Sequence, residues 1–213
     1  MIVDPNITSY IYSLEKDNPA PLEALRTFAE ETGVPVIRRE MESFIKVLLR
    51  LCKPGSILEI GSGIGYSAIF FAMNTPEDCH ITTIENFEER VIQCRENISG
   101  SGFKDRITLI DGDAAEILKD MHEPADMIFL DAAKAQYITM LPDILRLMKT
   151  GSVLLADNIL QDGHLTDSRY ITPRRQRTIH ERMREFVRAV KNTDELETSL
   201  ITIGDGVALS VKK

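Results

Sequence analysis

The sequence of 213 residues has no apolar run approaching the roughly 18 residues that a membrane-crossing helix needs. Its first eighteen residues are polar and include Asp4, Glu15, Lys16 and Asp17. This stretch lacks the basic start and apolar run of a secretory signal peptide. We therefore expect a cytoplasmic protein that has no membrane partner.

Cysteine is also scarce. Cys52, Cys79 and Cys94 are the only three, and no two of them form a C-x-x-C pair. An odd number of widely spaced cysteines argues against a disulfide framework and against a zinc site. We expect structural or surface thiols in a reducing compartment.

The chain also lacks internal repeats, low-complexity tracts and linkers. Its length suits one domain with a sizeable core. We predict a single domain over residues 1–213, in which residues 1–54 form a helical N-terminal cap and residues 55–213 form the core.

Positive charge is in deficit, with a net charge of -8, which argues against a protein that coats nucleic acid non-specifically. The segment from Arg169 to Lys191 is the exception, since it carries eight basic residues against Glu181 and Glu185. Such a segment can hold RNA phosphates, or it can be a solvated helix face with a few ion pairs. The candidate RNA-binding residues are Arg174, Arg175, Arg177 and Arg182.

Helical periodicity dominates the first fifty residues. Pro21 marks one helix start, residues 33–35 form a break, and residues 53–55 end a second helix. The predicted apolar faces are Leu22, Leu25 and Phe28 in the first helix and Phe44, Val47, Leu48 and Leu51 in the second.

Short apolar runs alternate with helical stretches from Ser56 onward, which predicts a parallel sheet covered on both faces. The predicted strands are 56–60, 81–84, 107–110, 127–130 and 153–156. The predicted crossover helices are 66–74, 87–99, 114–121 and 134–149.

The C-terminal part follows another pattern. A helix over about residues 173–192 precedes two strands, 199–203 and 207–211, joined by Gly204-Asp205-Gly206. This pattern is typical of a hairpin. The fold class is therefore α/β, a Rossmann-like, mostly parallel seven-stranded sheet with a C-terminal antiparallel hairpin. It differs from the six parallel strands of a dinucleotide-binding dehydrogenase domain.

The strongest local motif is Leu-Glu-Ile-Gly-Ser-Gly-Ile-Gly-Tyr-Ser at residues 58–67, between the first core strand and the next helix. Its glycines permit positive φ and let a ligand lie against the backbone. Glu85 ends the next strand, where a carboxylate can accept both hydrogen bonds of a ribose diol. A nucleotide-type site is favoured over a turn that binds nothing.

Glu59 favours S-adenosylmethionine over NAD, because a carboxylate just before the glycines would repel a pyrophosphate. It can instead receive the ammonium group of a methionine-like tail. Asp113 can accept a hydrogen bond from an adenine amino group, and Ala114 can offer its backbone N–H to the ring. Asp113 can equally be the N-cap of the following helix.

A candidate metal site lies at two further strand ends, which carry Asp131 and the pair Asp157-Asn158. Two carboxylates and an amide oxygen form the hard ligand set that suits Mg²⁺. Taken singly, each Asp could instead cap a helix. Lys134 follows Asp131 by about one helical turn and could reach an acceptor hydroxyl. Metal and Lys134 would together lower the pKa of that hydroxyl for attack on the sulfonium methyl, although Lys134 could also be solvated.

These residues, with Ile84-Glu85, Gly112-Asp113-Ala114, the run from Phe129 to Lys134, and Gly204-Asp205-Gly206, resemble the cation-dependent O-methyltransferases, which include catechol and caffeoyl-coenzyme A methyltransferases. The resemblance runs from about Val34 to the C-terminus. It implies the class I methyltransferase fold, S-adenosylmethionine, Mg²⁺ and a homodimer. It implies that Asp131, Asp157 and Asn158 are the metal ligands, with Lys134 and Asp131 catalytic. The expected cofactor residues are Ile37, Glu59, Gly61, Ser62, Gly63, Gly65, Tyr66, Ser67, Glu85, Asp113, Ala114 and Asp131.

The sequence departs from the catechol type at Ala132 and Ala133, where that branch carries His and Trp. The chain as a whole, with Pro-Arg-Arg-x-Arg at 173–177, is most similar to a bacterial branch, the tRNA 5-hydroxyuridine methyltransferases. A 5-hydroxyuracil can chelate Mg²⁺ through its 5-OH and 4-carbonyl oxygens, as a catechol does. We therefore expect methylation of 5-hydroxyuridine to 5-methoxyuridine in the tRNA anticodon loop.

Three alternatives remain open at this point. The first is an O-methyltransferase of small catechol-like or phenolic molecules, which would use the same catalytic residues. The second is an NAD-dependent oxidoreductase, for which the cluster of Asp131, Asp157 and Asn158 would have no use. The third is a cofactor-binding protein without catalysis, which would tolerate Asp157→Ala.

Overall fold

The computed structural model describes residues 3–168 and 170–213. Its strands are β1 Ser56–Ile60, β2 His80–Glu85, β3 Ile107–Asp111, β4 Ala125–Leu130, β5 Met148–Ala156, β6 Leu196–Ile201 and β7 Val207–Lys212. They form one seven-stranded sheet in the order β3-β2-β1-β4-β5-β7-β6. The predicted α/β class, with a mostly parallel sheet and a C-terminal antiparallel hairpin, is confirmed.

The helices also follow the prediction closely, and α4 has the predicted bounds. They are α1 Pro5–Leu14, α2 Ala20–Thr32, α3 Arg39–Cys52, α4 Tyr66–Asn74, α5 Glu88–Gly100, α6 Ala114–Asp120, α7 Tyr137–Arg146 and α8 Arg177–Asn192. Three short 3-10 helices are η1 Lys134–Gln136, η2 Gln161–Thr166 and η3 Arg174–Gln176. None of the helices formed by the described residues has both the length and the apolarity that a membrane crossing requires.

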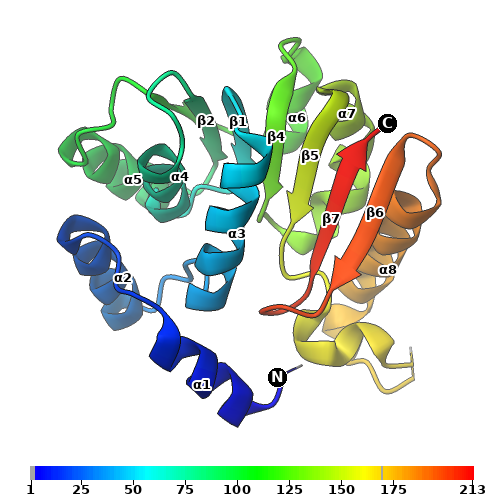
Figure 1. Ribbon diagram of the computed structural model, residues 1–213. Helices are drawn as coiled ribbons and strands as arrows, with labels where there is room; N and C mark the ends of the chain where they lie inside the picture. The colour runs from blue at the N-terminus through cyan, green and yellow to red at the C-terminus, as the bar shows by residue number, and fades with distance from the viewer. Residues whose placement is uncertain (1–2, 169) are drawn as a thin grey trace. The chain divides into compact units, whose positions relative to one another are not determined.

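The chain divides into two compact units, residues 6–114 and residues 115–213 with the first five residues, which are described in turn. In the first unit, β1, β2 and β3 pair in parallel, and α4 and α5 pack beside them (Figure 1). Every residue of α4 from Tyr66 to Ala72 is buried. The helix that follows the glycine turn is therefore fixed along almost its whole length.

The predicted apolar face of α3 is wrong. Met41, Ile45 and Leu49 form the buried face, whereas Val47 and Leu51 are 59% and 77% exposed. The helix carries apolar residues on two sides, so periodicity alone could not choose between them. Tertiary contacts decide the orientation, because Glu42, on the buried side, pairs with Arg26 of α2.

The second unit combines parallel pairing of β4 with β5 and antiparallel pairing of β7 with both β5 and β6. Figure 1 shows α7 and α8 on the same side of these strands. The rings of Tyr137 in α7 and Phe186 in α8 meet edge to face, with centroids 5.3 Å apart. This contact joins the two helices in the core.

Two predicted boundaries in this unit need correction. The helix predicted over 134–149 ends at Arg146, because Met148 already pairs with Ala125 of β4 as part of a longer β5. The first hairpin strand lies at Leu196–Ile201 rather than at 199–203, because Leu196 pairs with Lys212. In both places cross-strand pairing, which local sequence does not encode, sets the boundary.

The connection between β6 and β7 supports the loop that follows β5. Ile159 and Leu160 donate backbone hydrogen bonds to the carbonyls of Gly206 and Asp205, each at 3.0 Å. The Asp205 carboxylate accepts the backbone N–H of Asp162. Gly206 has φ +78°, and a Cβ there would collide with the Leu160 side chain. A side chain at position 206 is therefore excluded.

Gly206→Ala should destabilise the protein more than Gly151→Ala. Both glycines have positive φ, +78° and +88°, but a Cβ at Gly151 would meet no atom within 4 Å. Gly151→Ala should cost about 1–2 kcal/mol for the backbone alone, and overpacking should add about 1–3 kcal/mol at Gly206. Thermal unfolding followed by circular dichroism measures both. Equal midpoints would mean that Leu160 moves aside at no cost.

Candidate cofactor and metal sites

The glycine turn after β1 exposes its backbone through left-handed conformations. Gly61, Gly63 and Gly65 have φ of +102°, +52° and +84°. A Cβ at Gly63 would meet no atom within 4 Å, whereas one at Gly65 would lie 3.0 Å from Cys94 Sγ. Gly65 thus permits close packing against α5, while Gly63 leaves open space in which a ligand can approach the main chain.

Glu85, at the end of β2, holds this turn by its carboxylate. Its Oε2 accepts the N–H of Gly63 at 2.9 Å, and its Oε1 accepts the N–H groups of Asn86 and Phe87 at 3.0 Å. A carboxylate offers about four acceptor positions, so Glu85 keeps capacity for a ligand hydroxyl. The sequence prediction that Glu85 binds a ribose stays a prediction.

Glu59 is fully buried in β1, where its carboxylate accepts the hydroxyl of Thr83. Thr83 is the in-register neighbour of Glu59 on β2, and its hydroxyl also contacts that of Ser62 in the glycine turn. The chain Glu59–Thr83–Ser62 therefore links the buried charge to the turn.

Cys94 lies beneath Gly65 and has no nucleophilic role. Burial, followed by the negative charge of Glu59, raises the pKa of its thiol to about 12. The thiol is therefore protonated at neutral pH and acts as a packing group.

The other predicted cofactor residues of this unit occupy three places. Ile37 is 5% exposed and precedes α3, and Ser67 is 7% exposed in the first turn of α4. Asp113 and Ala114 are half-buried at the start of α6. Tyr66 is 1% exposed, and its hydroxyl donates to the Glu42 carboxylate. Any contact of Tyr66 with a cofactor would therefore be made by atoms other than the hydroxyl.

The second unit brings the three predicted metal ligands together. Leu130 and Ala156 are paired across β4 and β5, so Asp131 and Asp157 follow at neighbouring strand ends. Asn158 Nδ2 lies 3.2 Å from Asp131 Oδ1, and the Asp157 carboxylate accepts the N–H of Asn158 at 2.7 Å. The set consists of hard oxygen donors, which fits Mg²⁺.

Asn158 has φ +57°, an uncommon value for a residue with a side chain. Such strain is maintained only where the surroundings over-determine it. Here the N–H of Asn158 is held by Asp157, and the next two residues are held by the β6–β7 connection. The amide of Asn158 is thereby kept beside Asp131.

Lys134 and Tyr137 complete this cluster. Lys134 Nζ lies 2.9 Å from Asp131 Oδ1 and 3.2 Å from the Tyr137 hydroxyl. That hydroxyl lies 3.1 Å and 3.2 Å from the carbonyls of Leu130 and Asp157. Burial, followed by the charges of Asp131 and Asp157, raises the pKa of Tyr137 well above its ordinary value. Tyr137 therefore remains a neutral donor that ties the two strand ends together.

The predicted RNA-binding residues lie on η3 and α8. Arg174 and Arg175 are exposed, while Arg177 is half-buried and donates to the Thr172 carbonyl at 3.1 Å. Arg182 donates to the Ala135 carbonyl at 3.2 Å, one residue from Lys134. Arg169 lies outside the described residues. The basic segment thus contacts η1, which carries Lys134.

Comparison with known proteins places this geometry in a family. Residues 13–213 match the family model described as O-methyltransferase. The chain belongs to the O-methyltransferase family. It is 31% identical over 207 residues to a catechol O-methyltransferase of Niastella koreensis, covering 92% of this chain and 91% of the relative. These findings confirm the family predicted from the sequence.

Two solved structures agree with this assignment. A Staphylococcus aureus structure assigned to the caffeoyl-CoA O-methyltransferases has a TM-score of 0.90 and 32% identity, with 99% of this chain and 100% of that chain covered. The O-methyltransferase TomG of Streptomyces achromogenes, in complex with S-adenosylmethionine, has a TM-score of 0.84 and 25% identity, with 98% and 96% covered. The prediction of an S-adenosylmethionine-dependent O-methyltransferase is thus confirmed at the level of the family.

Sequence reasoning missed several residues of this O-methyltransferase that hold its candidate sites. Thr83 and Tyr137 lie inside apolar patterns that indicate only a strand and a helix. Their roles depend on neighbours 24 and 20 positions away, Glu59 and Asp157. For Tyr137 the available signal was its place one helical turn after Lys134.

Thr83→Val should destabilise this O-methyltransferase more than Thr82→Val on the same strand. Valine keeps the shape of Thr83 but removes the hydroxyl that donates to the buried Glu59 carboxylate. Loss of a donor to a buried charge should cost about 1–3 kcal/mol, whereas Thr82 is half-buried and lies outside this chain of contacts. Urea unfolding measures the difference. Equal free energies of unfolding would show that Thr83 contributes nothing to holding Glu59.

Proposed function

We propose that this O-methyltransferase transfers the methyl group of S-adenosylmethionine to the 5-hydroxyl of 5-hydroxyuridine in the tRNA anticodon loop, with Mg²⁺ bound beside the acceptor. The observation that carries the RNA part is the contact of Arg182 with the Ala135 carbonyl, next to Lys134. It places the basic segment within the unit that holds the candidate metal ligands.

S-Adenosylmethionine would supply the methyl group as an electrophilic sulfonium substituent. The open backbone at Gly63 offers room for the cofactor, and Glu85 has acceptor capacity for ribose hydroxyls. The buried Glu59 carboxylate provides negative charge for the methionine ammonium, directly or through water. Asp113 and Ala114 are the proposed adenine contacts, and Ile37, Ser62 and Ser67 the further cofactor positions.

Asp131, Asp157 and the amide oxygen of Asn158 are the proposed ligands of Mg²⁺. A magnesium ion there would lower the pKa of an acceptor hydroxyl. Lys134 Nζ is directed by Asp131 and Tyr137, and its ammonium donates a hydrogen bond to the acceptor oxygen as negative charge develops. These residues orient the acceptor, and the positive charge of Lys134 favours its deprotonated form.

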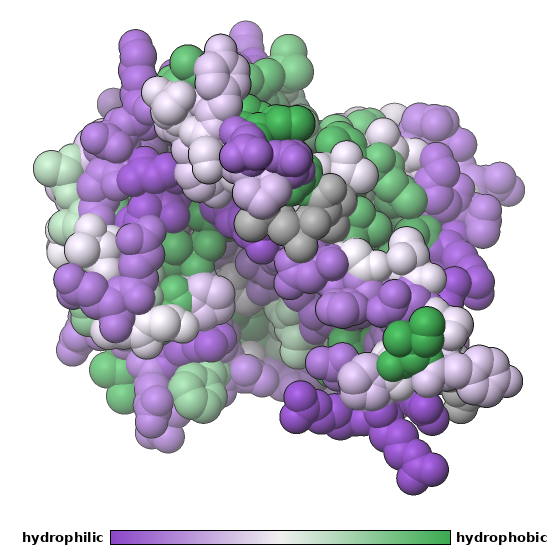
Figure 2. All heavy atoms as spheres, turned by 90° about the horizontal axis from the view of Figure 1, so that it is seen from below, coloured by the Kyte–Doolittle hydropathy of each residue, from purple (hydrophilic) through white to green (hydrophobic). Residues whose placement is uncertain are grey.

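A small catechol-like or phenolic acceptor is the second candidate. The name of the Niastella koreensis relative, a catechol O-methyltransferase, favours it. Figure 2 is compatible with both candidates, because hydrophobic atoms on the face shown form small groups separated by hydrophilic side chains. The homodimer expected from the family resemblance stays a prediction, which light scattering of the purified protein checks.

Methyl transfer should stop when EDTA removes divalent cations and resume when Mg²⁺ is added. Asp157→Asn keeps the shape and an acceptor for the Asn158 N–H but removes a charged ligand. Its activity should fall by about 100-fold or more, since even indirect metal contacts are worth about 10–100-fold. Asp120→Asn, at an exposed aspartate at the end of α6, is the control. Full turnover in EDTA would contradict the metal assignment.

Incubation with Mg²⁺, labelled S-adenosylmethionine and total tRNA from cells lacking the enzyme should produce 5-methoxyuridine, detected by nucleoside mass spectrometry. Arg174→Glu with Arg175→Glu should abolish this product, because two exposed cations become anions. Arg50→Glu, at an exposed arginine of α3, should leave it unchanged. The salt dependence of tRNA binding should weaken by roughly 0.7 in log–log slope for each lost contact.

Catechol separates the two candidate acceptors in the same assay. If the arginine variant and the wild-type protein methylate catechol equally while only the wild type modifies tRNA, the RNA proposal is supported. If tRNA from these cells gives no 5-methoxyuridine but catechol is methylated at a high rate, the acceptor is a small phenol.

A further inference from the structure

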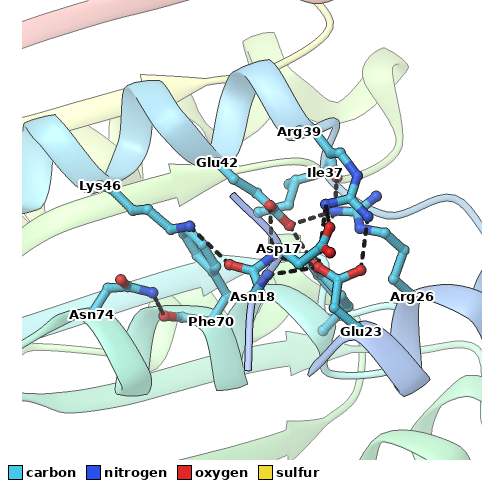
Figure 3. Close-up of polar contacts among 11 residues, drawn as sticks. Asp17, Asn18, Glu23, Arg26, Ile37, Arg39, Glu42, Lys46, Phe70 and Asn74 are labelled. Carbon is cyan, nitrogen blue, oxygen red and sulfur yellow. Dashed lines mark hydrogen bonds and ion pairs between the residues drawn. The ribbon is translucent and has the colours of Figure 1, made fainter. Parts of the chain in front are cut away.

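A buried polar cluster joins three segments of the first unit. It consists of Arg26 in α2, Glu42 in α3 and Tyr66 at the start of α4, which are 6%, 3% and 1% exposed. Figure 3 shows Arg26 and Glu42 directed toward one another beside Ile37. Neither Arg26 nor Glu42 stood out in the sequence, since both lie in ordinary amphipathic helices.

The Arg26 guanidinium is the centre of this cluster. Its Nη2 forms an ion pair with Glu42 Oε1 and lies 2.9 Å from both the Ile37 carbonyl and the Tyr66 hydroxyl. The Tyr66 hydroxyl in turn donates to Glu42. Burial, then the hydrogen bond to Glu42, raises the pKa of Tyr66 above its ordinary value, so the hydroxyl keeps its proton.

A second layer fixes the other oxygen of Glu42. Asn18 Nδ2 donates to Glu42 Oε2 at 2.8 Å, and Lys46 Nζ donates to Asn18 Oδ1 at 2.8 Å (Figure 3). The backbone N–H of Asn18 is held by Glu23, which pairs with Arg39. Both carboxylate oxygens of Glu42 are therefore engaged, and the carboxylate has a defined orientation.

Such a cluster is a poor means of increasing stability alone, because desolvation of a buried ion pair offsets most of its attraction. Its contacts instead specify position. The Ile37 carbonyl belongs to the segment between α2 and α3, and Tyr66 directly follows Gly65, the last glycine of the turn. One guanidinium thus fixes the distance between this segment and the first residue of α4.

We propose that Arg26, Glu42 and the Tyr66 hydroxyl are positioning residues that hold the Ile37 segment against the glycine turn and thereby set the affinity for S-adenosylmethionine. This inference rests on the proposed cofactor role of Ile37 and of the turn. The three side chains act through the backbone that they hold, so they should affect cofactor binding and leave the chemical step unchanged.

Tyr66→Phe tests the inference, because it removes one hydroxyl and keeps the buried ring. The Kd for S-adenosylhomocysteine, measured by calorimetry without acceptor, should rise about tenfold. The KM for S-adenosylmethionine should rise in parallel, while kcat at saturating cofactor stays within twofold. Tyr10→Phe removes the hydroxyl of a tyrosine that is 66% exposed in α1 and should change neither constant.

Arg26→Lys is the second variant, for the case that Tyr66→Phe fails to fold. Lysine keeps the charge beside Glu42 but cannot reproduce the planar fork that reaches Ile37 and Tyr66 together. Hydrogen exchange of residues 34–38 should be faster in this variant, while exchange in β4 and β5 should not change. Arg50→Lys on α3 is the matched control.

The outcomes separate the two proposals. A wild-type protein that does not bind S-adenosylhomocysteine would overturn the proposed cofactor site itself. Wild-type binding, together with variants whose Kd stays within twofold, would overturn the positioning role. A lower melting temperature with unchanged Kd and KM would identify the cluster as purely structural and would equally overturn the inference.

Discussion

Buried carboxylates need donors, and the way each one obtains them shapes both units of this O-methyltransferase. Glu85 takes backbone N–H groups from the glycine turn and from the start of α5. Glu59 takes a hydroxyl from the neighbouring strand, and Glu42 takes a guanidinium from α2. An ionised group in a low-dielectric interior costs several kcal/mol unless it is compensated in this way. Each carboxylate therefore fixes the backbone or side chain that satisfies it, and the candidate sites are built from segments held like this.

The sheet was predictable because its signal is local. Runs such as 56–60 and 107–110 are rich in β-branched residues and bounded by turn residues, and the strands lie there. The ends of these strands could be predicted to carry chemistry because carboxyl ends of parallel strands share one edge of a sheet. Asp131, Asp157 and Asn158 lie together for this reason. Strand position and strand direction are thus enough to find the candidate metal ligands.

What the sequence could not supply depends on contacts between distant residues. The orientation of α3 follows from the pairing of Glu42 with Arg26, 16 positions apart, and no periodicity encodes it. Thr83 became recognisable only once strand register placed it beside Glu59. The start of β5 at Met148 reflects pairing with Ala125 rather than any change in local propensity. In each case the deciding interaction is tertiary, and local patterns gave a plausible but different answer.

The charges around Asp131 bear on how the proposed reaction would proceed. Lys134 Nζ and Asn158 Nδ2 both approach the same oxygen of Asp131, Oδ1, at 2.9 Å and 3.2 Å. Two carboxylates and one ammonium leave this cluster with a net negative charge, which attracts a divalent cation. Once a divalent cation is added, the sum becomes positive by one unit, which an anionic acceptor oxygen would neutralise. The same residues that recruit the metal would therefore also favour the deprotonated acceptor, and Lys134 contributes to that balance whether or not it accepts a proton.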